Sequence, residues 1–231
     1  AVQQRGNGTT LLLSTTDGEV QTRNVVCATG AAAHPKAPEW VPQLTVPGPV
    51  IHSSEYQYPR QIPDGEVLIV GGGNGGVQLA RELAASHEVT LSIRSPRRSR
   101  RPISYPRLAG DRTTLMTRTR RPEPIFGDTY EQLRRVGVKI SPAVRSAEGD
   151  SVSLVDGSRL SLQSMILATG YYPGDDWLPE QAVTGRLRPT MTGLPGLFVA
   201  GMPQYGGRGA NTIAGVAADA ATIAHRITNR P

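Results

Sequence analysis

The sequence has a single cysteine, Cys27, among its 231 residues. One thiol excludes an internal disulfide, a Cys-x-x-Cys redox pair and a cysteine-rich zinc site. No stretch approaches the roughly 18 consecutive apolar residues of a transmembrane helix, so no such helix is expected. The first residues, Ala1 to Arg5, include neither an initiator methionine nor the apolar core of a signal peptide. A reducing, cytoplasmic location is the resulting expectation.

Lysine is also scarce, so the net charge of +6 comes almost entirely from arginine. Ten arginines but only one acid, Asp111, fall between Arg94 and Arg121. Such a run can form a solvated loop, a nucleic-acid surface or a membrane contact. Tyr105 is the only aromatic residue among these arginines, and prolines interrupt any amphipathic helix there. We therefore expect a solvated loop whose first members serve a phosphate group, with neither nucleic acid nor membrane as partner.

Glycine and proline are plentiful by contrast, at 26 and 19 residues, and 38% of the chain is hydrophobic. These fractions are typical of a loop-rich globular α/β protein rather than a disordered one. A chain of this length can bury a substantial core, either as one large domain or as two small ones.

One glycine cluster follows directly after an apolar run, in the segment Val67–Ala80. Three of its glycines have the G-x-G-x-x-G spacing, and the motif consists of Gly71, Gly73 and Gly76 with Asn74 and Gly75 inside it. The first glycine permits a tight turn, the second lets the backbone approach a pyrophosphate, and the third lets a helix pack against the strand. A helical pattern and a second strand, residues 88–93, come next. This β-α-β context predicts a dinucleotide site with the phosphates at the helix N-terminus.

The residues after the second strand indicate which dinucleotide binds. An NAD site usually has Asp or Glu about 20 residues after the glycines, where it holds the ribose 2′-hydroxyl group. This chain has Arg94, Arg97 and Arg98 there, and no carboxylate. Because guanidinium groups bind a 2′-phosphate bidentately and a carboxylate would repel it, the sequence predicts NADP.

The same succession of two strands, with Asp-Gly between them and Ala-Thr-Gly after them, occurs twice in the chain. The first copy has a strand, Asp17-Gly18, a second strand and then Ala28-Thr29-Gly30. The second copy has a strand, Asp156-Gly157, a short strand and then Ala168-Thr169-Gly170. Asp-Gly between β-rich runs is a hairpin signal, and each Ala-Thr-Gly is expected to follow a buried strand.

The second copy closes a unit that begins at Gly71, so the first copy is expected to close a similar unit. That unit's own glycine motif would then lie upstream of Ala1, in about 70 or more further residues. On this expectation, the sequence is part of a longer protein.

Three other segments carry expectations. Prolines between Pro35 and Pro49 indicate an extended connector. Residues 128–136 are expected to form a short helix capped by Asp128. A buried strand at residues 196–200 is followed by Gly201 and Met202. An alanine-rich helix then runs to about Ile227, with Asn211 or Thr212 as its cap, and its first N–H groups can face an electron-rich ligand edge.

In this order the motifs resemble those of the flavin-containing monooxygenases and their Baeyer–Villiger-type relatives, flavoproteins with two dinucleotide-binding domains. Val46-x-Gly48-x-x-x-His52-x-x-x-Tyr56 is similar to the family fingerprint, Phe-x-Gly-x-x-x-His followed by an aromatic residue or proline, although Val46 replaces the phenylalanine. Gly71 to Gly76 resembles the family's NADPH motif, and Ala168 to Tyr171 its second Ala-Thr-Gly. Residues 196–203 and 208–218 resemble the returning half of its FAD domain.

The resemblance implies an α/β fold with a Rossmann-like NADP-binding domain, a parallel sheet plus a β-meander, at residues 61–170. Residues 1–60 would be the end of the first FAD-domain segment with its linker, and residues 171–231 the returning FAD-domain segment. It also implies that NADPH reduces FAD, and that the reduced flavin uses O₂ to oxygenate a small organic substrate at nitrogen, at sulfur or beside a ketone.

By the same resemblance, His52, Ser53 and Tyr56 lie near the domain junction and help to place NADP against the flavin. No residue is assigned as a catalytic acid or base, and no metal is expected. The residues expected at cofactor sites are Gly71, Gly73, Asn74, Gly75, Gly76, Arg94, Arg97, Arg98, Ala28, Thr29, Gly30, Ala168, Thr169, Gly170, Gly201, Met202, Asn211 and Thr212.

Two other functions stay open at this point. A reductase that hands electrons to a disulfide would need a cysteine pair, which these residues lack, whereas one with a protein partner would not. A nucleotide-binding module without turnover would suit a chain that contains only part of an FAD site. The substrate and the oligomeric state do not follow from the sequence.

Overall fold

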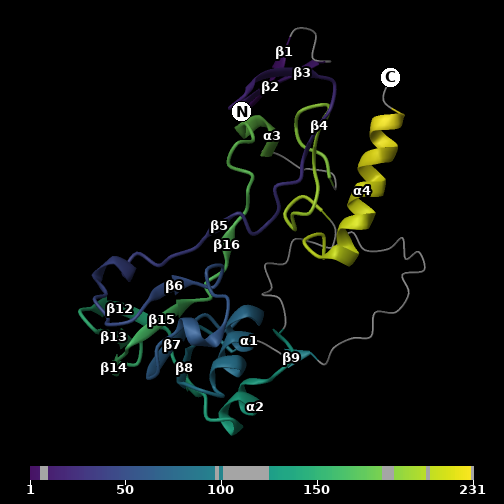
Figure 1. Cartoon of the computed structure of the whole chain (residues 1–231). Coiled ribbons are helices and arrows are strands. Elements are labelled where there is room, and N and C mark those ends of the chain that lie inside the picture. The colour runs from purple at the N-terminus through teal and green to yellow at the C-terminus, as the bar shows by residue number, and fades with distance from the viewer. Residues whose placement is uncertain (6–9, 97–98, 101–124, 184–189, 207–208, 230–231) are drawn as a thin grey trace. The chain divides into compact units, whose positions relative to one another are not determined.

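The structure is a computed structural model that describes residues 1–5, 10–96, 99–100, 125–183, 190–206 and 209–229. The chain forms two compact units, labelled by element in Figure 1. Unit 1 contains residues 1–34 and 171–231, and unit 2 contains residues 35–170. Residues 35–60 lie in unit 2, and the expected division into cofactor-binding domains stays a prediction.

Unit 2 is built on a five-stranded sheet in which every neighbouring pair is parallel. Its strands are β6 (Val50–His52), β7 (Glu66–Val70), β8 (Glu88–Ser92), β11 (Lys139–Ser141) and β15 (Ser164–Leu167). Their order across the sheet is β11-β8-β7-β15-β6. The described helices of the unit are α1 (Asn74–Leu83) and α2 (Tyr130–Arg135), with the 3₁₀ turns η1 (Val41–Gln43) and η2 (Pro59–Gln61).

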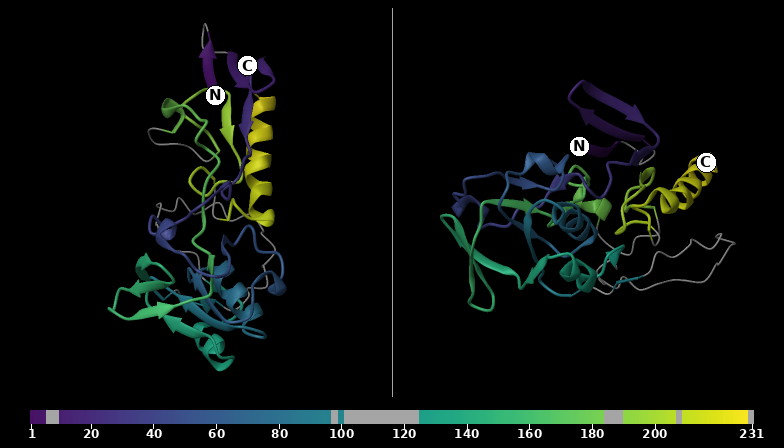
Figure 2. Two further views of the ribbon diagram at one scale, coloured as in Figure 1. Left: turned by 60° about the vertical axis from the view of Figure 1, so that its left-hand side comes forward. Right: turned by 60° about the horizontal axis from the view of Figure 1, so that its bottom comes forward.

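Both faces of this sheet are covered, as parallel sheets require. Successive side chains of β7 point to opposite faces, so Val67 and Ile69 pack in one core cluster and Leu68 in another. The first cluster also contains α1 residues such as Leu83 and the α2 residue Leu133. The second cluster contains apolar side chains of a three-stranded meander, which Figure 2 shows in green. Its strands are β12 (Val144–Glu148), β13 (Ser151–Leu154) and β14 (Arg159–Ser161). A separate parallel pair consists of β9 (Ser99–Arg100) and β10 (Ile125–Phe126).

Unit 1 combines both ends of the chain. Its antiparallel sheet has the strands β1 (Val2–Arg5), β2 (Thr10–Thr15) and β3 (Gly18–Thr22), and its parallel pair has β4 (Val25–Cys27) and β17 (Leu197–Val199). Its helices are α3 (Glu180–Val183) and α4 (Ile213–Thr228), while β5 (His34–Pro35) and β16 (Tyr171–Tyr172) occupy the two chain crossings. Leu197 and Val199 pack with Leu11 and Cys27, whereas Phe198 packs on the other face with Ile223 of α4.

The two predicted hairpins are confirmed, with Asp17 in the turn before Gly18, the first residue of β3, and Asp156 and Gly157 between β13 and β14. Each belongs to a three-stranded meander, and each meander is followed by the strand that ends at an Ala-Thr-Gly. In unit 2 that strand, β15, has parallel neighbours on both sides, β7 and β6. In unit 1, as far as the described residues show, its counterpart β4 pairs with β17 alone.

Two local expectations need correction. The proline-rich connector contains a sheet strand, β6, whose three residues are too few to carry a recognisable periodicity. The cap of α2 is Thr129 and not Asp128, because Thr129 Oγ1 accepts from Gln132 N at 3.1 Å and Gln132 Oε1 accepts from Thr129 N at 2.8 Å. Asp128 instead pairs with Arg81 of α1 at 3.6 Å.

No helix in the described parts of the chain is long and apolar enough to cross a membrane.

The third glycine of the motif, Gly76, gives a prediction about stability. A Cβ atom at this position would overlap the carbonyl oxygen of Gly71, whereas one at Gly75 meets nothing within 4 Å. We expect Gly76→Ala to lower the free energy of unfolding by about 1–3 kcal/mol, because α1 must move away from β7. Gly75→Ala is the matched control and should leave it unchanged or raise it by up to about 1 kcal/mol. Equal urea midpoints for the two variants would refute this account of the glycine.

Candidate functional site

The glycine loop begins at the carboxyl end of β7, between the ends of its two neighbouring strands. Gly71 has φ 124°, a conformation that favours glycine, and its N–H donates to Ser92 O of β8 at 2.9 Å. A Cβ atom at Gly71 would overlap the carbonyl oxygen of Ala168, the first residue after β15. The structure therefore brings the G-x-G-x-x-G motif and the second Ala-Thr-Gly together at one edge of the sheet.

Helix α1 begins at Asn74, and Gly73 is its N-cap. The first N–H groups of a helix have no acceptor within the helix, and they lie at the positive end of its dipole. The first turn contains no acidic residue that would repel an anion. Gly75 is exposed and its surroundings are open, so a ligand can reach the helix start. This arrangement can hold a pyrophosphate group.

Arg94 lies two residues after the end of β8 and is exposed. The carboxyl ends of β7 and β8 meet at the same edge of a parallel sheet, so Arg94 and the glycine loop share that edge. The other two arginines of the prediction, Arg97 and Arg98, lie outside the described residues. Arg94 is thus the described residue through which a 2′-phosphate would be bound.

His52, at the end of β6, is buried and holds the chain crossing at Gly170. Its Nε2 lies 3.1 Å from the carbonyl oxygen of Gly170, and its Nδ1 lies 2.9 Å from Ser54 Oγ and 3.2 Å from Ser54 N. Because a carbonyl only accepts hydrogen bonds, Nε2 carries the proton, and Nδ1 accepts from Ser54. Lys36 N donates to the same carbonyl at 2.9 Å, and Thr169 Oγ1 donates in return to Lys36 O.

Ser53 and Tyr56 also attach this segment to unit 2. Ser53 N donates to Leu167 O of β15 at 2.9 Å, and the Tyr56 ring packs against the core cluster that contains α1. Burial, together with the negative charge of Glu82 on α1, raises the pKa of Tyr56 from 10.0 to about 12. His52, Ser53 and Tyr56 thus hold backbone or core in the structure, and their part in placing NADP stays a prediction.

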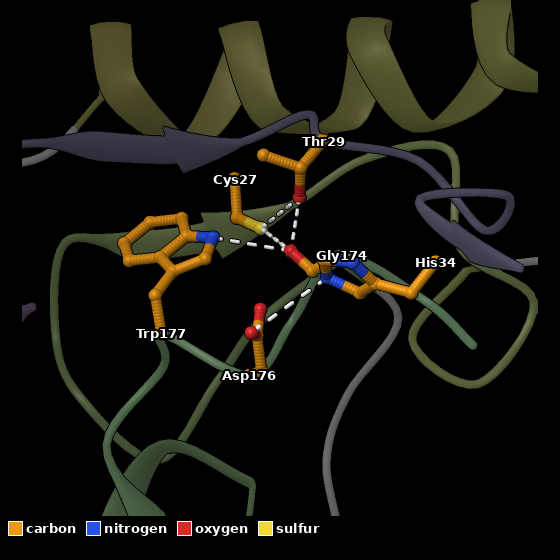
Figure 3. Close-up of polar contacts among 6 residues, drawn as sticks. All are labelled: Cys27, Thr29, His34, Gly174, Asp176 and Trp177. Carbon is orange, nitrogen blue, oxygen red and sulfur yellow. Dashed lines mark hydrogen bonds and ion pairs between the residues drawn. The ribbon is translucent and has the colours of Figure 1, made fainter.

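In unit 1 the first Ala-Thr-Gly holds a turn of the same unit, as Figure 3 shows. Thr29 Oγ1 donates to the carbonyl oxygen of Gly174, and Trp177 Nε1 donates to the same oxygen at 3.1 Å. Gly174 N donates to Gly30 O at 3.0 Å, and the Cys27 thiol lies 3.2 Å from Thr29 Oγ1. A Cβ atom at Gly174 would lie only 2.9 Å from the Thr29 side chain. Thr29 and Thr169 therefore make equivalent hydrogen bonds, because each hydroxyl donates to a backbone carbonyl of a neighbouring segment.

The other predicted residues of unit 1 surround β17 and the start of α4. Gly201 has φ 76°, whereas the Met202 side chain is fully buried in the core, so only its backbone can reach a ligand. Thr212 caps α4 by accepting from Gly215 N at 3.0 Å, which leaves Asn211 outside the helix. Ile213, the first residue of α4, is 96% exposed. The start of this helix is open to a ligand.

No group of three or more His, Cys, Asp or Glu side chains in the described residues could hold a metal ion. The sequence reasoning missed one residue at the glycine loop: Tyr130 of α2, which donates to Gly72 O at 2.7 Å. A tyrosine at the start of a short helix carries no signal of such a contact, and only the fold brings it to the loop.

His52 gives a prediction about the crossing. We expect His52→Ala to lower the free energy of unfolding by about 1–3 kcal/mol, since a buried donor is lost and a cavity forms. Ser53→Ala is the control, because Ser53 bonds to Leu167 O through its backbone N–H, which alanine keeps. The measurement is urea unfolding of both variants, and a loss as large for Ser53→Ala would contradict this role of the His52 ring.

Tyr56 gives a prediction about alkaline pH. Its raised pKa favours the neutral phenol in the folded chain, so its contribution to stability is complete below pH 10 and is lost as the pH rises towards 12. We expect the wild type to lose stability relative to Tyr56→Phe over that range, as measured by urea unfolding at a series of pH values. Tyr58→Phe should track the wild type, because Tyr58 is 55% exposed. A difference between wild type and Tyr56→Phe that does not change with pH would be evidence against the shifted pKa.

Comparison with known proteins identifies the family. The family model described as pyridine nucleotide-disulphide oxidoreductase matches residues 1–201. A protein of Geobacillus kaustophilus named uncharacterized oxidoreductase CzcO-like is 30% identical, over 94% of this chain and 68% of the relative. Probable indole-3-pyruvate monooxygenase YUCCA9 of Arabidopsis thaliana is 28% identical, over 94% of this chain and 62% of the relative. The chain thus spans roughly two thirds of the length of these relatives.

Solved structures share the fold. A flavin-containing monooxygenase from Stenotrophomonas maltophilia has a TM-score of 0.73 at 20% identity, over 98% of this chain and 68% of that one. The open crystal structure of cyclohexanone monooxygenase has a TM-score of 0.65 at 14% identity, over 99% and 67%. Bacillithiol disulfide reductase Bdr from Staphylococcus aureus has a TM-score of 0.64 at 17% identity, over 99% and 70%. The α/β fold and the resemblance to flavin monooxygenases are confirmed, and the chain belongs to the pyridine nucleotide-disulphide oxidoreductase family.

Proposed function

We propose that the chain is the nicotinamide-dinucleotide-binding part, with a portion of the flavin-binding part, of an NADPH- and FAD-dependent monooxygenase. The observation that carries this proposal is the glycine loop at the carboxyl end of β7, with the open start of α1 behind it. The substrate class is a small organic molecule that is oxygenated with O₂ at nitrogen, at sulfur or beside a ketone. The probable indole-3-pyruvate monooxygenases among the relatives favour an oxygenase over other family activities.

The residues of unit 2 fit a dinucleotide. At Gly71 and Gly76 a Cβ atom would overlap backbone, so glycine is what lets strand, loop and helix lie this close together. Open space at Gly75 leaves room for a phosphate beside the helix N–H groups. Arg94, with no carboxylate at the end of β8, favours a ligand that carries a 2′-phosphate, and NADP is therefore the dinucleotide that we propose.

The residues of unit 1 fit the flavin end of FAD only in part. The backbone at Gly201 and Met202 and the exposed start of α4, at Asn211 and Thr212, could hold it. When bound, FAD supplies the redox chemistry of the reaction. The part played by this chain is to bind, to orient and to limit access of water, and none of its described residues is assigned a proton-transfer step.

A reductase is the second candidate, because a bacillithiol disulfide reductase shares the fold. The only cysteine of the chain, Cys27, is buried at 1% exposure in the core of unit 1, which does not favour dithiol chemistry within this chain. Oxygen consumption that depends on an organic substrate distinguishes the oxygenase from the reductase. A dinucleotide-binding module without turnover would bind NADP and take up no flavin.

The first test uses the source protein at full length, loaded with FAD. Anaerobic addition of NADPH is expected to bleach the flavin absorption at roughly 450 nm, as hydride transfer reduces the flavin. Air and substrate should then restore the band while the substrate gains one oxygen atom. A band that stays unchanged with NADPH would refute the proposed function.

Arg94 gives a prediction about cofactor choice. We expect Arg94→Ala to weaken NADP⁺ binding by about tenfold, since a charge-assisted contact to the 2′-phosphate is worth about 1.4 kcal/mol or more. Binding of NAD⁺, which lacks that phosphate, should change little. Arg145→Ala in β12 is the control, because Arg145 bonds to Val155 O within the meander region. Calorimetric titration measures both ligands, and an equal loss for NADP⁺ and NAD⁺ would rule out this role for Arg94.

A further inference from the structure

The glycine loop is held by a side chain from outside the β-α-β unit. Tyr130, the first residue of α2, donates from its hydroxyl to the carbonyl oxygen of Gly72 at 2.7 Å. Two side chains pack tightly against Gly72. A Cβ atom at Gly72 would lie 2.7 Å from Tyr130 Oη and 2.5 Å from Ile93 Cγ2. Tyr130 and Ile93 together leave Gly72 no room for a side chain.

Tyr130 is itself held firmly. The capping box of Thr129 and Gln132 fixes the first turn of α2 around it, and the Arg81–Asp128 ion pair joins the residue before that cap to α1. Leu133, one turn later, is fully buried in the core cluster shared with α1. The short helix α2 is therefore attached to the same helix whose N-terminus faces the proposed phosphate site.

The hydrogen bond fixes the orientation of one peptide group. In a trans peptide the C=O of one residue and the N–H of the next point in opposite directions. Holding Gly72 C=O towards Tyr130 therefore turns the N–H of Gly73 away from Tyr130. Gly73 is the N-cap of α1 and the glycine at which the backbone would approach a pyrophosphate. The direction of its N–H is thus set before any ligand arrives.

We propose that Tyr130 is a positioning residue for the pyrophosphate of the dinucleotide, acting through the Gly72–Gly73 peptide group. This inference rests on the proposed function, since it takes the glycine loop to be the cofactor site. Tyr130 does not touch the ligand in this account. It removes the need to order that peptide group at the moment of binding, and preorganisation of this kind raises affinity.

Two features separate this role from a merely structural one. A pyrophosphate-positioning residue acts equally on NADP⁺ and NAD⁺, because both ligands carry the same pyrophosphate. It leaves binding of adenosine 2′-monophosphate unchanged, because that molecule has the 2′-phosphate without the pyrophosphate. General damage to the unit would weaken all three ligands.

The experiment compares the unmodified chain with Tyr130→Phe, which keeps the ring and removes only the hydroxyl group. Tyr58→Phe is the control, since Tyr58 is 55% exposed and directly precedes η2. Calorimetric titration with NADP⁺, NAD⁺ and adenosine 2′-monophosphate gives the affinities, and urea unfolding shows whether each variant is folded. We expect Tyr130→Phe to weaken NADP⁺ and NAD⁺ by about 3- to 10-fold each, the loss of one neutral hydrogen bond, with adenosine 2′-monophosphate unaffected.

Three results would overturn the inference. Unchanged dinucleotide affinity in Tyr130→Phe, with the unmodified chain binding NADP⁺, would remove the role of Tyr130 and leave the proposed function standing. An equal loss for adenosine 2′-monophosphate would reduce Tyr130 to a structural residue. An unmodified chain that binds none of the three ligands would remove the proposed cofactor site, and this inference with it.

Discussion

The candidate site of unit 2 depends on one close approach, where the ends of β7 and β15 and the start of α1 meet without side chains between them. Gly71 lies against the carbonyl of Ala168, and Gly76 lies against the carbonyl of Gly71. Since either Cβ atom would overlap backbone, glycine at both positions is what allows the helix start to stand directly beyond the strand end. The open start of α1 follows from that geometry, whereas Arg94 is placed by strand β8.

A second constraint concerns the places where the chain crosses between its units. At one place, in unit 2, the Gly170 carbonyl accepts from both Lys36 N and His52 Nε2. In unit 1, four residues further along the chain, the Gly174 carbonyl accepts from Thr29 Oγ1 and Trp177 Nε1. The threonine hydroxyl of each Ala-Thr-Gly thus donates to a backbone carbonyl close to a crossing. These tripeptides are therefore explained by chain geometry, and cofactor contact through their backbone remains a separate prediction.

Much of this could be predicted from the sequence, because the signals were local. The strand, glycine loop and helix of residues 67–83 follow from an apolar run and glycine spacing, and both Asp-Gly hairpins follow from turn chemistry. The rest depended on contacts between distant segments. Strand β6 forms because β15 offers it an edge, and His52 finds Gly170 118 residues further along the chain. Thr129 caps α2 through its capping box with Gln132, while the Asp128 carboxylate pairs with Arg81 of α1.

Tyr130 shows what such distant contacts can add to a binding site. The motif glycines make the loop possible, but glycine is flexible, and a loop of three consecutive glycines starts with more conformational freedom than a phosphate site can use. A hydrogen bond from a neighbouring helix restores order without placing a side chain in the loop. The two residues would then have separate roles. Arg94 would select NADP over NAD by binding the 2′-phosphate, whereas Tyr130 would orient the backbone for the pyrophosphate that both dinucleotides contain. Because one acts on selectivity and the other on general affinity, their effects should be separable by ligand.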